Sequence, residues 1–592
     1  MQKSEGNVLP SSTVAQAFFH YLKLEGVTHL FGIPGGGLAN LLNEIKNDNS
    51  EIEYIVCRQE TGAGYAADGY YRATDKLGVV VVTSGPGATN ALTGIMNAEN
   101  DGSAVMLVTG EVAQQYYGKG YLQEGIDAVL DVDTIFKAAT RYSTSIDAAS
   151  DMQALTEQAL RDALALPRHA VHLSFPDNVS VETLNTDSLP PSTASYRTVQ
   201  TAASTEDVEQ AVKALTSAKQ PVIFLGNGCR QAMRNKETRD AFLKFVETYN
   251  IPVMTTADGK GIFPESHPLS LRVYGIASCQ WTWYYLHPDN GNYDAIMVIG
   301  SSLGELSTMK WNPLLCPKGP FIQVDINSAI IGRGFPLTHG IVAEAAAFIK
   351  KLPQTISKFP PDAKTVSARG ELIKKIKTSY SPIESKEQYE SEASPLRPAA
   401  AMRVIQNTLP ANSKIFVDAG NCVGWTVHYL KVDFPQEIFT ALSMGPMGFA
   451  VGAVVGAKTG CPDDVVVCVT GDGAFLMQGA EVSTAARHKI GAIWIVLNDN
   501  DLAMVSQGQA HFFPAEGPRK EWEEIFDLGN PDLVKYAESL GADAYHACDP
   551  KELDEAMKKA VRNSADGKPQ VVIMKIDKKD IPPYYNQLFS SK

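Results

Sequence analysis

Short apolar runs alternate with helical patterns along almost the whole chain. The runs are rich in β-branched residues and end in Gly, Asp or Asn before the next helical stretch. Examples are GVVVVTSGPG at 78–87, AVMLVTGEV at 104–112 and DVVVCVTGDG at 464–473. Such runs are typical of parallel strands that are buried on both faces. The pattern predicts an α/β fold made of several doubly wound parallel sheets.

Two polar, proline-containing stretches interrupt this pattern, at residues 178–204 and 354–396. We interpret both as linkers because they are weakly periodic and rich in turn-forming residues. They leave three blocks of a size usual for single domains, at 9–180, 204–353 and 396–580. The sequence shows no close internal repeat, although three sheets of one class could be the same fold reused.

The length and charge of the chain narrow its class. A chain of 592 residues is too long for one hydrophobic core, which agrees with several domains. The net charge of −14 leaves no basic surface for nucleic acid or for an anionic membrane. We therefore expect neither partner, and we expect any anionic ligand to be held by a metal ion, helix N-termini and loop amides.

The cysteines and the N-terminal residues of the sequence indicate in which cellular compartment the protein acts. The eight cysteines are dispersed and form no C-x-x-C pair, which favours free thiols in a reducing environment. Residues 1–12 lack the apolar core of a signal peptide. The longest apolar runs are also far shorter than the ~18 residues of a membrane span. The sequence thus predicts a cytoplasmic, multi-domain protein.

Candidate ligands of a metal ion and a diphosphate directly follow two predicted strands of the third block, 396–580. One apolar run leads into GDG at 471–473, and the next leads into NDND at 498–501. In a parallel sheet both strands end at the same edge, where ligands usually bind. The carboxylates of Asp472 and Asp499, with a loop carbonyl such as that of Asp501, are hard oxygen ligands suited to Mg²⁺. The glycines would let backbone amides approach a diphosphate.

A GDG segment by itself is more often only a connection from a strand to a helix. With the Asn-Asp pair one strand later, however, the arrangement resembles the signature of the thiamine diphosphate (ThDP) enzymes, in which a pair of asparagines follows GDG. Asp499 stands where that family usually has asparagine, which adds a carboxylate and changes the local charge. The resemblance implies ThDP and Mg²⁺ as cofactors.

The first block resembles the same family motif by motif. It contains HLFGIPGGGLANLLNEI at 29–45, RQETGAGYAADGYYRAT at 58–74 and SGPGATN at 84–90. These segments are similar to the pyrimidine-binding domain of the acetolactate synthase and pyruvate oxidase branch. The likeness covers 9–180 and 396–580 and is loose in the middle block. It implies three doubly wound domains, namely a pyrimidine-binding, a middle and a diphosphate-binding domain.

This resemblance assigns roles to single residues. Glu60 takes the place of a buried glutamate that bonds N1′ of the pyrimidine and shares a proton with it, as a carboxyl in an apolar site can. Taken alone, Glu60 could be only a helix N-terminal carboxylate facing the helix dipole.

In the third block, Met447 takes the place of the residue that bends ThDP, although methionine in such a stretch is ordinarily core. The carbonyl of Gly445 would hold N4′. Asn421 and Cys422 stand where acetolactate synthases have Gln-His against the diphosphate, so that Asn421 would keep a donor and Cys422 would pack.

The full set of implied residues joins the first and third blocks. The implied catalytic residues are Glu60, Gln123 and Gly36. The implied cofactor-binding residues are Glu60, Asn90, Gly420, Asn421, Gly445, Met447, Gly471, Asp472, Gly473, Ala474, Asp499 and Asp501. The implied metal ligands are Asp472, Asp499 and Asp501. Family members bridge the two domains across a dimer interface, so the resemblance implies a homodimer or homotetramer with active sites between subunits.

The segments that choose among ThDP reactions depart from acetolactate synthase. Leu122 replaces a phenylalanine beside Gln123, which could admit a larger donor side chain. Asp177 stands where acetolactate synthases have a lysine. GSSLGEL at 300–306 lacks the arginine of a motif that helps to bind FAD and the second 2-oxo acid. Losing both cations removes the obvious clamps for a pyruvate acceptor. FAD binding is therefore doubtful, and so is plain acetolactate synthesis.

Several functions remain open at this point. We expect an acetolactate synthase-like carboligase that decarboxylates a 2-oxo acid donor and transfers the acyl carbanion to a second carbonyl, the acceptor. The missing His-His dipeptide of the pyruvate decarboxylase branch favours this reaction, and His428 and Tyr429 are further candidates to reach the site. The alternative is a decarboxylase that releases an aldehyde. An FAD-dependent oxidase and a non-catalytic binding module are the remaining hypotheses, and the joint presence of Glu60, Asp472 and Met447 speaks against the module.

Overall fold

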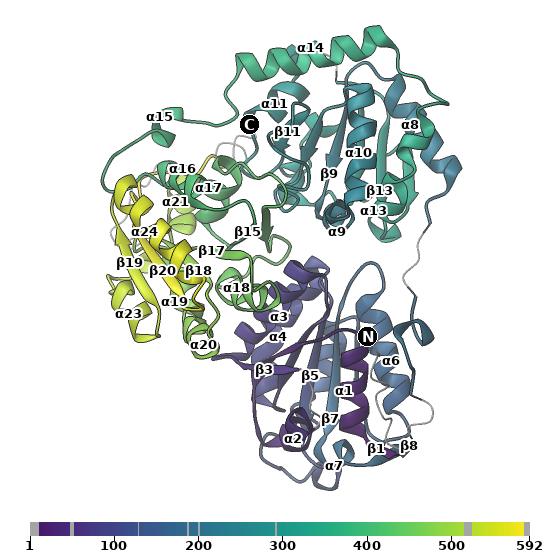
Figure 1. The fold of residues 1–592 in the computed structure, drawn as a ribbon, viewed down its shortest axis with the longest axis vertical. Coiled ribbons are helices and arrows are strands. Elements are labelled where there is room, and N and C mark those ends of the chain that lie inside the picture. The colour runs from purple at the N-terminus through teal and green to yellow at the C-terminus, as the bar shows by residue number, and fades with distance from the viewer. Residues whose placement is uncertain are drawn as a thin grey trace, which may run out of the picture.

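The chain folds into three lobes, each built on one parallel sheet (Figure 1). The computed structural model describes residues 11–47, 52–127, 129–185, 189–198, 202–290, 293–513 and 524–584. Each sheet has six strands, and helices pack against the sheets. The predicted fold class, α/β with three doubly wound parallel-sheet domains, is confirmed. No helix among the described residues has both the length and the apolar character needed to cross a membrane.

The N-terminal lobe carries the first sheet, with strand order β3-β2-β4-β5-β7-β6. Its strands are β2 (His29–Ile33), β3 (Glu53–Val56), β4 (Gly78–Val82), β5 (Val105–Glu111), β6 (Tyr142–Ser145) and β7 (Ala170–Pro176). Its helices are α1 (Val14–Leu24), α2 (Ala39–Asn47), α3 (Glu60–Thr74), α4 (Pro86–Asp101), α5 (Val132–Ala139), α6 (Met152–Leu164) and α7 (Asp177–Ser180). The central strands are buried at every position, as the continuous apolar runs predict. A short antiparallel pair, β1 (Ser11–Thr13) with β8 (Thr183–Asn185), continues this lobe to residue 185.

The C-terminal lobe has the order β16-β15-β17-β18-β20-β19. Its strands are β15 (Ser413–Val417), β16 (Glu437–Thr440), β17 (Val465–Gly471), β18 (Ile493–Asn498), β19 (Asp543–Ala547) and β20 (Gln570–Lys575). Its helices are α16 (Pro398–Thr408), α17 (Asn421–Tyr429), α18 (Phe449–Gly460), α19 (Asp472–Gln478), α20 (Glu481–His488), α21 (Ala503–Phe512), α23 (Leu533–Ser539) and α24 (Pro550–Ser564). Numbered within each lobe, both this sheet and the N-terminal one run 2-1-3-4-6-5.

The middle lobe has a different order, β11-β10-β9-β12-β13-β14, which reads 3-2-1-4-5-6. Its strands are β9 (Pro221–Leu225), β10 (Val253–Thr255), β11 (Ser270–Val273), β12 (Ala295–Ile299), β13 (Phe321–Asp325) and β14 (His339–Val342). Its helices are α8 (Thr205–Ser217), α9 (Arg230–Arg234), α10 (Lys236–Tyr249), α11 (Gln280–Leu286), α12 (Glu305–Thr308) and α13 (Ala345–Ile349). Only the two outer lobes therefore share one topology.

The linker interpretation of 354–396 is wrong for much of its length. Residues Ala363–Ser379 form the helix α14, which lies along the middle lobe (Figure 1). Ile373 and Ile376 are buried there, and Arg369 donates to four backbone carbonyls of the middle lobe. The sequence hides this helix because its buried stripe has only two apolar residues and an arginine that satisfies backbone groups. The short helix α15 (Lys386–Tyr389) follows it.

Helices α3 and α18 join the outer lobes at backbone contact distance (Figure 1). A Cβ atom on Gly456 would lie 1.8 Å from the carbonyl oxygen of Ala66, and one on Gly69 would lie 2.0 Å from that of Ala453. Both positions therefore require glycine, because the obstacle on each side is helix backbone that cannot rotate away. Glycines at this contact bring the two axes closer than larger residues would allow.

The middle lobe is fastened to both outer lobes through Arg234. Its guanidinium lies 2.6 Å from Asp75 of the N-terminal lobe and 2.9 Å from Glu437 of the C-terminal lobe. It also donates to the carbonyl oxygen of Arg72 at 2.7 Å. One planar cation thus satisfies acceptors from two other domains, a geometry that arginine supports better than lysine.

We predict that Gly456→Ala destabilises the protein. Alanine gains ~1 kcal/mol over glycine in a helix interior. The clash with the Ala66 carbonyl outweighs that gain, and we expect a net loss of at least ~2 kcal/mol. The measurement is the midpoint of the first urea-unfolding transition, followed by tryptophan fluorescence.

Gly304→Ala is the matched control, because the nearest atom to a Cβ there lies 3.8 Å away. Gly304 is the N-cap of the four-residue helix α12, where alanine costs at most about 1 kcal/mol, so the midpoint of Gly304→Ala should fall much less than that of Gly456→Ala. Equal midpoints for Gly456→Ala and wild type would contradict the account of the α3–α18 contact.

Candidate active site

A cavity of about 220 Å³ opens at the carboxyl edge of the C-terminal sheet. It is lined by Ala419, Gly420, Asn421, Cys422, Gly445, Met447, Gly471, Asp472, Gly473, Ala474, Leu497, Asp499, Asp501, Leu502, Ala503, Met504, Val505 and Ile576. Every implied cofactor-binding residue of the third block is among them. The loops after β15, β16, β17 and β18 supply most of this lining, because parallel strands end at one edge.

A buried carboxylate, Asp472, and a half-buried one, Asp499, stand side by side in the cavity. Asp472 accepts the backbone N–H groups of Asp499 at 3.1 Å and of Asn500 at 2.6 Å. Burial raises the pKa of Asp472 to about 6. Burial and then the charge of Asp472 raise the pKa of Asp499 to about 7. Two neighbouring anions in a buried place are costly, and a divalent cation between them would remove that cost.

Three glycines leave the floor of the cavity open. A Cβ on Gly420, Gly445 or Gly471 would meet no atom within 4 Å, so each faces space that a ligand could fill. Gly420 and Gly445 also have φ values of 125° and 69°, which favour glycine. Met447 stands beside this floor, with its Cε 3.2 Å from the position of a Cβ on Gly473.

Asp418 is an anchor of this site that the sequence reasoning missed. It is fully buried at the end of β15, and its carboxylate accepts the N–H groups of Gly448, Ala450 and Val451 at 2.8 to 3.4 Å. Burial raises the pKa of Asp418 to about 7, although these donors favour the carboxylate. The bonds fix the start of α18, which begins two residues after Met447. A charged residue closing a buried strand was the available signal.

The implied residues of the first block gather at the carboxyl edge of the N-terminal sheet. Asn90 donates to the carboxylate of Glu60 at 3.1 Å, and Glu60 is 8% exposed. The amide of Gln123 lies 3.5 Å from the hydroxyl of Thr83, in the loop after β4. Gly36 lies in the loop after β2, the neighbouring strand. These loops flank the point where the strand order reverses, as do the cavity loops of the C-terminal lobe.

Glu481 is a second anchor that the sequence did not reveal. It is buried in α20, and its carboxylate accepts the N–H groups of Arg58 and Gln59, both at 3.0 Å. These residues directly precede Glu60. The C-terminal lobe therefore holds the start of α3 in place.

Among the residues that the structure describes, the cavity of the C-terminal lobe does not include the group around Glu60. None of Gly36, Glu60, Asn90 and Gln123 is among the residues that line the cavity of the C-terminal lobe. Large apolar side chains are exposed around both groups. Near Gln123 they are Tyr116, Tyr121, Leu122 and Val129. At the cavity they are Met447, Met504 and Val505, with Phe512 and Phe513 beyond them at the end of α21. Exposed apolar surface of this kind commonly marks a protein interface.

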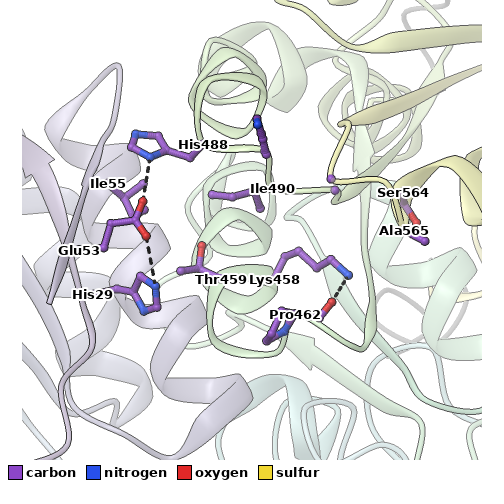
Figure 2. Close-up of a pocket in the computed structure, with 13 residues that line it drawn as sticks. His29, Glu53, Ile55, Lys458, Thr459, Pro462, His488, Ile490, Ser564 and Ala565 are labelled. Atoms are coloured by element: carbon purple, nitrogen blue, oxygen red, sulfur yellow. Dashed lines mark hydrogen bonds and ion pairs between the residues drawn. The ribbon is translucent and has the colours of Figure 1, made fainter. Parts of the chain in front are cut away.

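A larger hollow of about 300 Å³ lies between the outer lobes and contains none of the implied residues (Figure 2). Glu53 stands there between His29 and His488, at 4.0 and 3.4 Å. The His488 Nε2 accepts the N–H of Val56, and the Lys458 ammonium donates to the carbonyl of Pro462. Since these polar groups already have protein partners, we interpret the hollow as a seam between domains.

Family models decide the identity of the chain. Residues 12–130 match the N-terminal TPP binding domain of the thiamine pyrophosphate enzymes. Residues 208–352 match their central domain, and residues 418–574 match their C-terminal TPP binding domain. The chain belongs to the thiamine pyrophosphate enzyme family. It is a ThDP-dependent enzyme, as the motifs predicted.

Relatives cover nearly the whole chain. One is the "Probable acetolactate synthase large subunit" of Methanococcus aeolicus, 30% identical over 562 residues, with 92% of this chain and 90% of the relative aligned. The acetolactate synthase large subunit of Lactococcus lactis is 29% identical, with 92% and 90% covered. The isozyme 3 large subunit of Escherichia coli is 25% identical, with 91% of each chain covered. The resemblance to the acetolactate synthase branch is thus confirmed.

The cavity of this ThDP enzyme fits a diphosphate with a divalent cation. The open glycines and the N-terminus of α17 offer backbone N–H groups to phosphate oxygens. On either side of Asp499, the side-chain oxygens of Asn498 and Asn500 are buried and have no hydrogen-bond partner among the described residues. Within the described residues no group of three or more His, Cys, Asp or Glu side chains forms a metal site. The expected ion would instead use two carboxylates, a carbonyl and oxygens of the ligand.

His428 and Tyr429 do not reach the site of the ThDP enzyme. His428 is 2% exposed, its Nδ1 faces the carbonyl of Ser278 at 3.0 Å, and its Nε2 accepts the N–H of Glu384 at 2.8 Å. Both residues pack between the C-terminal and middle lobes. Cys422 packs as expected, 2% exposed with its thiol against the Asp418 carbonyl, and it also lines the cavity.

We predict that His428 makes the stability of the enzyme acid-sensitive. Burial, with the charges of Lys260 and Arg272 nearby, lowers the pKa of His428 from 6.5 to about 4. The unfolded chain therefore binds the proton first as pH falls. The contribution of neutral His428 is complete above about pH 6.5 and is lost on the way to pH 4, by on the order of 2 kcal/mol at pH 5.

The measurement compares urea midpoints of wild type and His428→Gln between pH 7.5 and 5. Glutamine can keep both hydrogen bonds but cannot titrate, so its midpoint should fall less with acid. His287→Gln, at a half-exposed histidine, should follow the wild-type curve. Parallel curves for wild type and His428→Gln would refute the prediction.

Proposed function

We propose that this ThDP enzyme is a Mg²⁺-dependent carboligase. It would decarboxylate a 2-oxo acid and transfer the resulting acyl carbanion to the carbonyl of a second substrate. The observation that carries the proposal is the convergence of Asp472, Asp499 and three open glycines in one cavity. Relatives named as acetolactate synthases over nine-tenths of the chain support the reaction class.

One group of residues would bind the pyrimidine ring of the cofactor, and another would bind its diphosphate. When bound, ThDP supplies the nucleophilic carbon and the electron sink for loss of CO₂. Glu60 would hold a proton at N1′ of the pyrimidine, and Asn90 would keep the carboxyl oriented through its 3.1 Å hydrogen bond. Asp472 and Asp499, with the carbonyl of Asp501, would bind Mg²⁺ against the diphosphate. Met447 would support the bend of the cofactor, and the carbonyl of Gly445 would hold N4′.

A complete site would need two copies of the chain. The residues of the Glu60 group do not line the Asp472 cavity of their own chain, and both places are bordered by exposed apolar side chains. A symmetric dimer would cover both surfaces and would pair each Glu60 with a cavity of the other copy. We therefore propose a homodimer or homotetramer that acts in the cytoplasm on small molecules.

The substrates would differ from those of plain acetolactate synthesis. Leu122 is 82% exposed beside Gln123, so its smaller side chain leaves room for a larger donor. Asp177, which replaces a lysine, accepts a hydrogen bond from Asn40 at 3.0 Å and so belongs to the fold of its lobe. These departures argue against a clamp for a pyruvate acceptor.

FAD is not part of the proposal. The hollow at the reversal point of the middle sheet, between Gly228, Gly300 and Asp325, measures about 60 Å³. Ligand pockets usually measure ~300–1,000 Å³. The segment 300–306 also lacks the expected arginine.

The proposal is tested by product analysis with ThDP, Mg²⁺ and a panel of 2-oxo acids, supplied singly and in pairs. Mass spectrometry should find a product that weighs one CO₂ less than the two substrates together. Free aldehyde without a coupled product would instead support the alternative, a decarboxylase. No loss of CO₂ from any acid would reject both.

We predict that Glu60→Gln removes turnover but spares cofactor binding. Glutamine keeps the size and a hydrogen bond but cannot exchange a proton with N1′, so kcat should fall at least ~100-fold. The Kd for ThDP, measured by isothermal titration calorimetry, should stay within about tenfold, the worth of one hydrogen bond. Glu182→Gln, on the exposed surface of the same lobe, is the control. Full activity of Glu60→Gln would sink the assignment.

We predict that Asp472→Asn weakens ThDP binding through loss of the metal. The Kd for ThDP at saturating Mg²⁺ should rise by about 100-fold, and EDTA should no longer change it. Asp463→Asn removes the same charge from the exposed surface of the same lobe and should bind like wild type. If wild type and Asp472→Asn bind ThDP equally, with and without EDTA, the metal site is refuted.

A further inference from the structure

The side-chain amide of Asn421 is held from two sides. Asn421 is the first residue of α17 and lines the cavity. Its Nδ2 donates to Oε1 of Gln507 at 3.0 Å, and its Oδ1 accepts the hydroxyl of Tyr584 at 2.5 Å. The partners come from α21 and from the segment after the last strand, so three separate parts of the lobe meet at one amide.

The orientation of these amides follows from the acceptors around them. The Nε2 of Gln507 donates to the carbonyl oxygens of Lys578 and Asp580, both at 3.0 Å. A carbonyl can only accept, so the Gln507 amide cannot turn over without losing both bonds. Its Oε1 must therefore face Asn421, which in turn must present Nδ2 to Gln507 and Oδ1 to Tyr584.

One N–H of the Asn421 amide is left for a ligand. An NH₂ group has two hydrogens, and Gln507 takes one of them. The second has no acceptor among the residues that the structure describes. Because Asn421 lines the cavity beside Gly420 and Gly471, an anion on the open glycine floor would be within reach of this donor.

The C-terminal segment 576–584 is itself firmly placed. Ile576 lines the cavity and donates its N–H to the carbonyl of Asn498 at 3.1 Å. Arg397 forms an ion pair with Asp580. Tyr584 is 1% exposed, and its ring lies 2.4 Å from where a Cβ on Gly424 would stand. Because the segment is held in place, its contacts through Gln507 and Tyr584 can hold the side chain of Asn421 in one orientation.

We propose that the C-terminal segment 576–584 is part of the cofactor site. Through Gln507 and Tyr584 it sets the Asn421 amide so that the remaining N–H donates to the diphosphate of ThDP. The proposal rests on the proposed function, in that the cavity takes the diphosphate end of ThDP. Gln507 and Tyr584 are thus positioning residues, which act on the ligand only through Asn421.

A role of Tyr584 in positioning Asn421 can be told apart from a role in packing the end of the chain. If Tyr584 only packed the end of the chain, removing its hydroxyl would affect ThDP binding equally whether or not Asn421 is present. If it acts through Asn421, the effect must vanish once the amide is gone. A double-mutant cycle on ThDP affinity measures this difference.

The experiment determines the Kd for ThDP by isothermal titration calorimetry, at saturating Mg²⁺, in the full-length protein. Tyr584→Phe should raise the Kd about three- to tenfold in the wild-type background, as expected for loss of an orienting hydrogen bond. In an Asn421→Ala background the same change should alter the Kd by less than about twofold. Tyr545→Phe, which removes a hydroxyl from the far edge of the same sheet, should leave the Kd unchanged.

Equal weakening by Tyr584→Phe in both backgrounds, or none in either, would overturn the proposal. Gln507→Leu provides the same cycle through the other partner, and it decides the matter if Tyr584→Phe does not fold. An additive effect of Gln507→Leu would likewise overturn the proposal. Failure of the wild-type protein to bind ThDP would instead reject the proposed function itself, before either cycle is begun.

Discussion

The backbone contact between α3 and α18 is the constraint on which the rest of this structure depends. Gly69 and Gly456 let the two helices touch at carbonyl oxygens of the opposite helix. Glu60 is the first residue of α3, and Met447 stands two residues before α18. A rigid contact between the helices therefore fixes the Glu60 group and the Asp472 cavity of one chain relative to each other. Glu481 and Asp418 complete this by holding the starts of α3 and α18 through backbone N–H groups.

The three parallel sheets then determine where ligands can lie. The outer lobes share one strand order, and in both the loops at the reversal point carry the residues suited to a cofactor. The middle lobe has its own order, and the hollow at its reversal point measures about 60 Å³. The family models assign TPP binding to the outer pair, and the middle lobe contributes the Arg234 contacts that hold the outer lobes together.

Much of the fold was predictable because buried parallel strands leave a strong signal. The runs at 78–82 and 465–470 are apolar at almost every position, and GDG marks the edge at which one of them ends. The helix α14 was not predictable, since its buried stripe relies on Arg369 binding carbonyls that only the folded middle lobe supplies. The cavity residues followed from the family motifs. Their anchors did not, because Glu481 acts on a residue 423 positions away and Tyr584 on one 163 positions away.

The central claim is that a complete site combines Glu60 of one chain with Asp472 of another. The most direct test co-expresses Glu60→Gln and Asp472→Asn chains carrying different tags and isolates all dimers together. A mixed dimer with shared sites has one site with both changes and one with neither, so the preparation should regain about one quarter of wild-type activity. At a ThDP concentration far below the Kd of Asp472→Asn, each variant by itself should be nearly inactive. An inactive mixture that contains the doubly tagged dimer would show that each site is built from a single chain, and it would contradict the account.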